Sequence, residues 1–91
     1  MYQIIFTESY LKIVTKWIKK HPTLKNKYYN TIRLLELNPF HNSLRLHKLQ
    51  GSLSEFYSVS IDMKYRIMID FTIDNDQIIP LNIGDHSIYR E

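Results

Sequence analysis

The hydrophobic pattern of this chain changes its period at Asn38-Pro39, and this change most constrains the fold. Before it, apolar residues recur at spacings of three and four in two segments, residues 8–20 and 22–37, as in helices that bury one face. Thr7 is a suitable N-cap for the first helix. His21-Pro22 separates the two, because the residue before proline avoids the helical region. Such a short link predicts an antiparallel helical hairpin.

Beyond residue 39 the pattern favours strands, and alternation is clearest in residues 56–62 and 65–71. We expect further strands at residues 2–6, 44–49 and 77–83, a hairpin turn at Asp62-Met63-Lys64, and an edge or bulge at Pro80, which cannot donate to a ladder. The prediction is an α+β fold. An N-terminal strand precedes a two-helix antiparallel hairpin packed on a twisted, mainly antiparallel sheet of four to five strands.

Composition places the chain among single globular domains. Its 91 residues are 44% apolar and 23% charged, and we expect one domain over residues 1–91. The absence of cysteine excludes disulfides, thiolate zinc sites and cysteine nucleophiles. No apolar run reaches the roughly 20 residues of a membrane span. Nor does the N-terminus resemble a secretory signal, so we expect a cytoplasmic protein without membrane contact.

Charge is distributed unevenly along the sequence. Residues 1–50 carry nine Lys and Arg against two acids, and residues 51–91 carry three against seven, so the net charges are +7 and −4. A basic half suits an acidic protein partner or a nucleic-acid backbone, although a solvated helix surface has the same composition.

The candidate chemistry is a cluster of cations with titratable imidazoles. Arg45, His47 and Lys48 fall on one expected strand, and period 2 places Arg66 on the open face of the sheet with Ser58, Ser60 and Met68. His86 follows the last strand, with Tyr89 and Arg90 nearby. Cations can stabilise charge on a phosphodiester while histidine exchanges a proton, and tyrosine can stack on a base. Structural roles stay open: Arg66 can pair with Asp62 or Asp70, and His47 and Tyr89 can serve packing. No histidine pair has metal-ligand spacing, and no metal site is expected.

Five segments of the sequence form a set of motifs: Asn38-Pro39-Phe40, the block Leu44-Arg45-Leu46-His47-Lys48-Leu49-Gln50-Gly51, Tyr57-Ser58-Val59-Ser60-Ile61, Tyr65-Arg66-Ile67, and Ile83-Gly84-Asp85-His86-Ser87-Ile88-Tyr89-Arg90. Together these motifs resemble the RelE/ParE superfamily of bacterial toxin–antitoxin toxins, especially the RelE/StbE and YafQ-like branches.

This resemblance implies a RelE-like toxin domain. It further implies a metal-independent messenger-RNA endoribonuclease without cofactors, which acts in the ribosomal decoding site by attack of the 2′-OH on the adjacent phosphate. A cognate antitoxin would be its protein partner. Matching motifs assign catalytic roles to His86, His47, Lys48 and Arg66, and substrate contacts to Tyr89. Arg45 is a phosphate-contact candidate by charge, with Arg90 and Ser60 as further candidate substrate contacts.

The sequence also departs from the YafQ-like pattern. Ser60 stands where those toxins place a further histidine, and Lys64-Tyr65 replaces an acidic–aromatic pair. Two alternatives therefore stay open: a ParE-like inhibitor that binds DNA gyrase, and a toxin relative without activity. Retention of His47, Lys48, Arg66 and His86 favours RNA cleavage.

Overall fold

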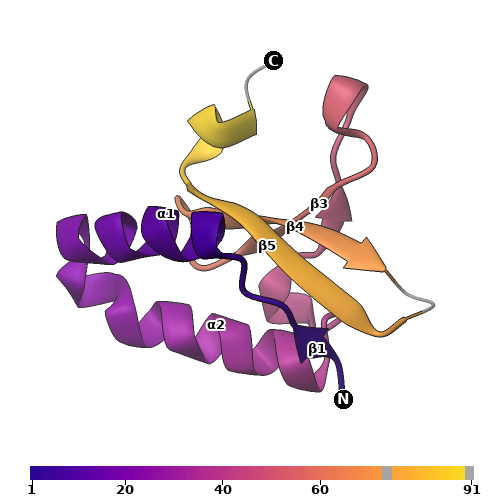
Figure 1. The fold of residues 1–91 in the computed structure, drawn as a ribbon, viewed down its shortest axis with the longest axis horizontal. Coiled ribbons are helices and arrows are strands. Elements are labelled where there is room, and N and C mark those ends of the chain that lie inside the picture. Colours follow the sequence, from indigo (N-terminus) through magenta and orange to yellow (C-terminus); the bar gives the residue numbers. More distant parts are fainter. Residues whose placement is uncertain (73–74, 90–91) are drawn as a thin grey trace.

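The computed structural model describes residues 1–72 and 75–89 and has helices on one side of a mixed sheet (Figure 1). Its α-helices and strands, in chain order, are β1 (Gln3–Ile4), α1 (Glu8–Lys20), α2 (Lys25–Leu37), β2 (His47–Lys48), β3 (Tyr57–Ser60), β4 (Arg66–Thr72) and β5 (Gln77–Gly84). Four short 3₁₀ helices complete the fold: η1 (Pro22–Leu24), η2 (Asn42–Leu44), η3 (Gly51–Leu53) and η4 (His86–Tyr89). The α+β prediction is confirmed.

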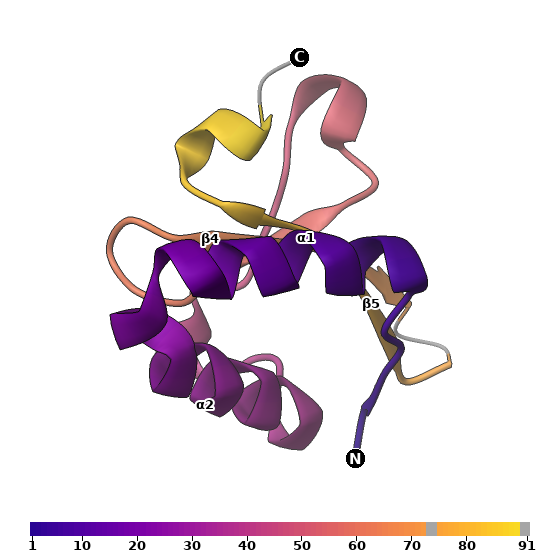
Figure 2. The same ribbon diagram turned by 60° about the vertical axis from the view of Figure 1, so that its left-hand side comes forward.

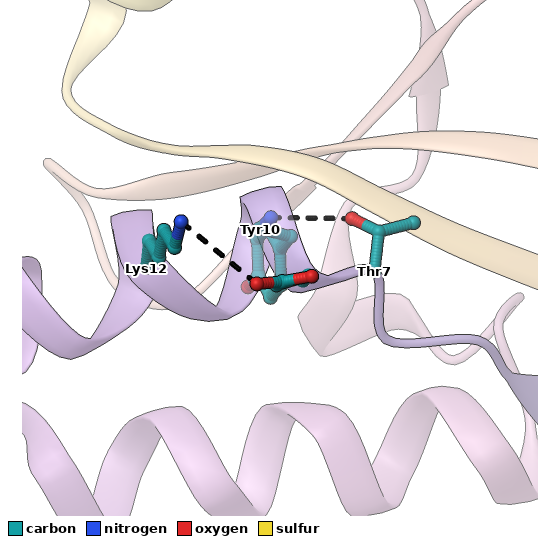
Figure 3. A network of polar contacts seen from close by, with 4 residues as sticks. Thr7, Tyr10 and Lys12 are labelled. Atoms are coloured by element: carbon teal, nitrogen blue, oxygen red, sulfur yellow. Dashed lines mark hydrogen bonds and ion pairs between the residues drawn. The ribbon is translucent and has the colours of Figure 1, made fainter.

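The helical hairpin begins and ends close to where the sequence places it. Thr7 caps α1, with its hydroxyl oxygen accepting a hydrogen bond of 3.1 Å from the backbone N–H of Tyr10 (Figure 3). The same figure shows the exposed ion pair of Lys12 with Glu8 one turn earlier, at 3.9 Å. The second helix differs from expectation, because residues 22–24 form a 3₁₀ turn closed by a bond from the backbone N–H of Lys25 to the carbonyl oxygen of Pro22. The chain thus reverses tightly before α2 begins.

The sheet has five strands in the order β1-β5-β4-β3-β2. β1 runs parallel to β5, and every other neighbouring pair is antiparallel. Asp62 closes the β3–β4 turn, accepting bonds from the backbone N–H groups of Lys64 and Tyr65 at 2.9 and 2.7 Å. The register of β4 with β5 shifts between Met68 and Ile69, where Ile69 stands opposite Pro80. Pro80 therefore lies at an irregularity of the ladder, as expected of a residue without an N–H.

The expected strand at residues 44–49 is largely wrong. Only His47 and Lys48 pair with β3, while Asn42–Leu44 forms a 3₁₀ turn. This turn is capped by the ring of His41, whose Nδ1 accepts a bond of 3.1 Å from the backbone N–H of Ser43. Arg45 then adopts left-handed backbone angles, φ 48° and ψ 45°. Such angles cannot continue a ladder, so pairing starts two residues later.

The core lies between the hairpin and one face of the sheet. As predicted from period 2, the odd-numbered residues of β3 and β4 face the core: Val59, Ile67, Ile69 and Phe71 are buried and Tyr57 is partly buried. The helices add Tyr10, Val14, Trp17, Tyr28, Ile32 and Leu35. Figure 2 shows α1 and α2 on this side of the sheet, with η4 (yellow) and the segment around η3 (pink) projecting from the other. None of the helices in the described part of the chain has the length and apolar character needed to cross a lipid bilayer.

Candidate functional site

Strand register brings one expected histidine and one expected arginine onto the same face of the sheet. His47 stands opposite Ser58, and Ser58 opposite Met68, while Ser60 stands opposite Arg66 in the next row. Residues directly opposite in antiparallel strands point to the same side. Since the intervening Val59 is fully buried beneath the helices, these rows lie on the face that the helices leave free.

The C-terminal 3₁₀ helix covers part of this face. The hydroxyl groups of Tyr89 and Ser58 form a hydrogen bond, and Ser58 is fully buried although it lies on the face opposite the helices. Two contacts set the direction of η4: the carboxylate of Asp85 accepts bonds from the backbone N–H and the hydroxyl of Ser87, at 3.0 and 2.6 Å. Tyr89 therefore covers Ser58 on this face of the sheet.

The environment of Tyr89 also reports on Arg66. Burial raises the pKa of the Tyr89 hydroxyl above its ordinary value, whereas the hydrogen bond with Ser58 and the positive charge of Arg66 act to lower it. The charge of Arg66 thus acts on the same hydroxyl that Ser58 binds. Burial is the largest of these effects, so the environment favours the protonated form of the Tyr89 hydroxyl. No ion pair joins Arg66 to Asp62 or Asp70 among the contacts of the described residues.

His86 lies at the start of η4 with an exposed side chain. Its ring packs edge-on against that of Tyr89, with 5.5 Å between the ring centroids and an angle of 87° between the planes. It also lines a shallow hollow of about 320 Å³ with Lys64, Asp85 and Ser87. The imidazole therefore adjoins Tyr89 and faces open space that a substrate can enter.

His47 is held in one tautomer by the backbone. Its Nδ1 lies 3.1 Å from the carbonyl oxygen of Arg45. A carbonyl can only accept, so Nδ1 carries the proton and donates it. In the neutral ring Nε2 is then an unprotonated acceptor on an exposed side chain. This arrangement suits a proton acceptor.

Three expected site residues, Lys48, Arg45 and Ser60, do not join this cluster. Lys48 stands opposite Tyr57, so alternation along β2 directs it to the helix side of the sheet, away from His47. Arg45 is not on a strand, contrary to expectation, and lies with Ser60 at the edge of the sheet in a separate hollow. Arg90 lies outside the described residues. Among the remaining residues, His47 stands opposite Ser58 and Tyr89 is hydrogen-bonded to it, while His86 and the charge of Arg66 adjoin Tyr89.

No role for Ser58 or Lys27 follows from the sequence alone. Ser58 was expected on the open face, but only its contact with Tyr89 shows that it anchors the C-terminal segment. Lys27 lies on α2 and lines the same hollow as Arg45 and Ser60. Nothing in the local pattern distinguishes Lys27 from the other exposed lysines, because the contact depends on how the hairpin packs.

Several solved structures with a similar fold are toxins or toxin–antitoxin complexes. YafQ from E. coli strain BL21(DE3) matches over 100% of both chains with a TM-score of 0.78 and 18% identity. The E. coli DinJ-YafQ toxin-antitoxin complex matches over 99% of this chain and 98% of that chain, with a TM-score of 0.76 and 21% identity. The YoeB/ParE toxin from Agrobacterium tumefaciens matches over 92% of this chain and 98% of its own, with a TM-score of 0.72 and 16% identity.

The chain has the fold of the RelE/YafQ-type toxins. No family model matches its sequence, and no curated protein matches it either. The likeness lies in the backbone, as the low identities require, and the expected RelE-like architecture is confirmed.

Proposed function

We propose that this protein is the toxin of a type II toxin–antitoxin system and cleaves messenger RNA in the ribosomal decoding site. The observation that supports the proposal is the hydrogen bond of Tyr89 with Ser58, which joins the segment carrying His86 to the sheet face that bears His47 and Arg66. Two imidazoles, a fixed cation and an aromatic ring are the groups that metal-independent RNA cleavage needs. The reaction takes place in the cytoplasm, where ribosomes translate.

In the proposed reaction, the 2′-oxygen of the RNA forms a bond to the adjacent phosphorus while the bond from phosphorus to the 5′-oxygen breaks. Nε2 of His47 takes the 2′-OH proton, since Nδ1 is already bonded to the carbonyl oxygen of Arg45. His86, as imidazolium, gives a proton to the leaving 5′-oxygen. Arg66 offsets the negative charge that grows on the phosphate oxygens. Tyr89 lies beside His86 and provides a ring for a base to stack on.

A single-turnover assay on programmed ribosomes tests this proposal. A positioned proton-transfer group contributes about 10²- to 10⁴-fold to rate, so His86→Ala should slow cleavage by about that factor. His86→Gln should be no faster, because an amide does not titrate. Both variants should unfold at the wild-type temperature, since the side chain is exposed. Cleavage at the wild-type rate in either variant would remove His86 from the chemistry.

Lys48 provides a comparison with Arg66. Because its position in β2 directs it to the helix side of the sheet, Lys48→Gln should reduce cleavage less than Arg66→Gln does. The reverse order would support the catalytic role that the resemblance assigns to Lys48. Growth arrest with intact messenger RNA and inhibited supercoiling would instead point to gyrase as the target, and an absence of growth arrest to an inactive relative.

We further propose a cognate antitoxin as protein partner. The DinJ-YafQ structures are toxin–antitoxin complexes of the same fold, and the +7 charge of residues 1–50 suits an acidic partner segment. Co-expression with the product of the neighbouring gene should relieve growth arrest and yield a complex on co-purification. Continued toxicity without a complex would exclude that product as the antitoxin.

A further inference from the structure

A second hollow, separate from the histidine cluster, lies where the sheet edge is left unpaired. It has a volume of about 190 Å³ and is lined by Lys27, Ser43, Arg45, Ser60, Ile61, Asp62 and Met63. β2 pairs with β3 only as far as Ser58, because the left-handed turn at Arg45 takes the chain out of the ladder. The backbone that would otherwise fill this edge is displaced, and the hollow opens beside Ser60.

The polar groups around the hollow suit an anion. Lys27 and Arg45 are exposed cations that reach it from α2 and from the end of η2. The one acid in the lining is Asp62, and its Oδ1 already accepts two backbone hydrogen bonds in the β3–β4 turn. The hollow is thus lined by two cations and one carboxylate, and one oxygen of that carboxylate already accepts hydrogen bonds from the backbone.

The hydroxyl of Ser60 is the observation that points to a ligand. Ser60 is only 6% exposed, and its Oγ has no hydrogen-bond partner among the residues that the structure describes. A buried hydroxyl without a partner is costly, and native proteins rarely keep one without a reason. Arg45 adds a second unusual feature, because non-glycine residues seldom adopt left-handed angles and such residues often cluster at functional sites.

We infer that this hollow binds a phosphate of the messenger RNA next to the phosphate that is cut. Ser60 shares a face of the sheet with Arg66 and stands directly opposite it in the register. Arg66 is the cation that the proposed reaction puts at the phosphate that is cut, so a phosphate held beside Ser60 would be its neighbour along the RNA. The hollow therefore continues the proposed cleavage site along the RNA backbone. The inference rests on the proposed function for the identity of the RNA.

The first test measures how salt affects binding of a short single-stranded RNA oligonucleotide. Each lost phosphate contact reduces the slope of log K against log salt by about 0.7 for single strands. Lys27→Gln and Arg45→Asn should each show this reduction; asparagine is chosen because it tolerates left-handed angles. Lys25→Gln is the matched control, an exposed lysine of the same helix that does not line the hollow. Slopes equal to that of the control, or no binding of the oligonucleotide by the wild type, would overturn the inference.

The second test uses the unpartnered hydroxyl. Ser60→Ala should leave thermal stability unchanged or raised, because the hydroxyl has no partner to lose, yet weaken oligonucleotide binding by about tenfold through loss of a bond to a charged group. A lowered stability with unchanged binding would show that Ser60 serves the fold alone, and would overturn the inference.

Two further arms identify the phosphate. In a series of oligonucleotides, a single neutral methylphosphonate linkage replaces each phosphate in turn. For one position of this linkage, Arg45→Asn should no longer weaken binding. If the variants weaken binding only to ribosomes without messenger RNA, the phosphate belongs to ribosomal RNA and the assignment to messenger RNA fails. If the Lys27→Gln and Arg45→Asn variants show reduced salt slopes but the wild type does not cleave RNA on ribosomes, this inference holds and the proposed function fails. If the variants have the slope of the control and the wild type cleaves, the proposed function holds and this inference fails.

Discussion

A single hydrogen bond decides how the C-terminal residues contribute to the candidate site. Ser58 and Tyr89 are 31 residues apart, and their hydroxyl groups meet on the face opposite the helices. Ser58 is fully buried, so its hydroxyl depends on Tyr89 for a partner. Through this bond Tyr89 is fixed, and with it the neighbouring ring of His86.

We expect Tyr89→Phe to lower the free energy of unfolding by about 1–3 kcal/mol, because it leaves the buried hydroxyl of Ser58 without a partner. Ser58→Ala should cost less, since the hydroxyl of Tyr89 is only half-buried and can reach water. The double variant should be more stable than the sum of the two losses predicts. Urea unfolding of all four proteins measures this, with the exposed Tyr29→Phe as a control that changes little. Strict additivity would show that the two hydroxyls do not interact.

At the scale of elements, η4 is held in place by close packing at Gly84. A Cβ atom at this position would lie 2.7 Å from Cγ2 of Ile88, a separation that real contacts do not allow. Gly84 also stands opposite Arg66 in the sheet. The glycine therefore lets η4 fold back closely beside the strand that carries Arg66.

Gly84→Ala should displace η4 and slow RNA cleavage. The free energy of unfolding should change little, because the core lies on the other side of the sheet. Ile88→Ala removes the clashing methyl group, so the double variant should recover part of the activity. Amide chemical shifts of Ser58 and Tyr89 report the displacement independently of cleavage. Wild-type shifts in Gly84→Ala would contradict the proposed packing, as would a double variant no better than the single one.

At the scale of the whole molecule, a buried tyrosine pair links the two helices. The hydroxyl groups of Tyr10 and Tyr28 lie 2.9 Å apart, and the side chains are 0% and 3% exposed. Burial raises the pKa of both hydroxyls, most strongly for Tyr10. The folded protein therefore keeps protons that the unfolded chain releases near pH 10.

Stability should accordingly be full below about pH 10 and fall as the pH rises further, because only the unfolded state then loses these protons. Each retained proton contributes about 1.4 kcal/mol per pH unit to this fall. Tyr10→Phe should make the fall of stability with pH shallower by about one proton, because the most strongly shifted hydroxyl is then absent. Urea unfolding between pH 9 and 11 measures the slopes. An unchanged slope in Tyr10→Phe would exclude Tyr10 as its source.

The helices and the central strands could be predicted from the sequence because their information is local. The spacing of Tyr10, Val14 and Trp17 defines a buried helix face, and alternation through β3 and β4 defines a core face, whatever the neighbouring elements are. Thr7 and Asp62 each accept a hydrogen bond from a backbone N–H three residues further along the chain. The predicted N-cap of α1 and the predicted turn between β3 and β4 are therefore also confirmed.

The site depended on contacts that no local pattern contains. Alternation placed Arg66 on the open face, but only the fold shows that Tyr89 covers Ser58 there, or that Lys27 meets Arg45 and Ser60 at the sheet edge. Most of the strand expected at residues 44–49 is absent, because the left-handed turn at Arg45 keeps that residue out of the ladder. Within the short strand that remains, Lys48 and His47 point to opposite faces. Sequence thus determined the elements and their buried faces, through periodicity and short-range hydrogen bonds. Tertiary structure decided which exposed side chains meet, because that depends on strand register and on the path of a single left-handed residue.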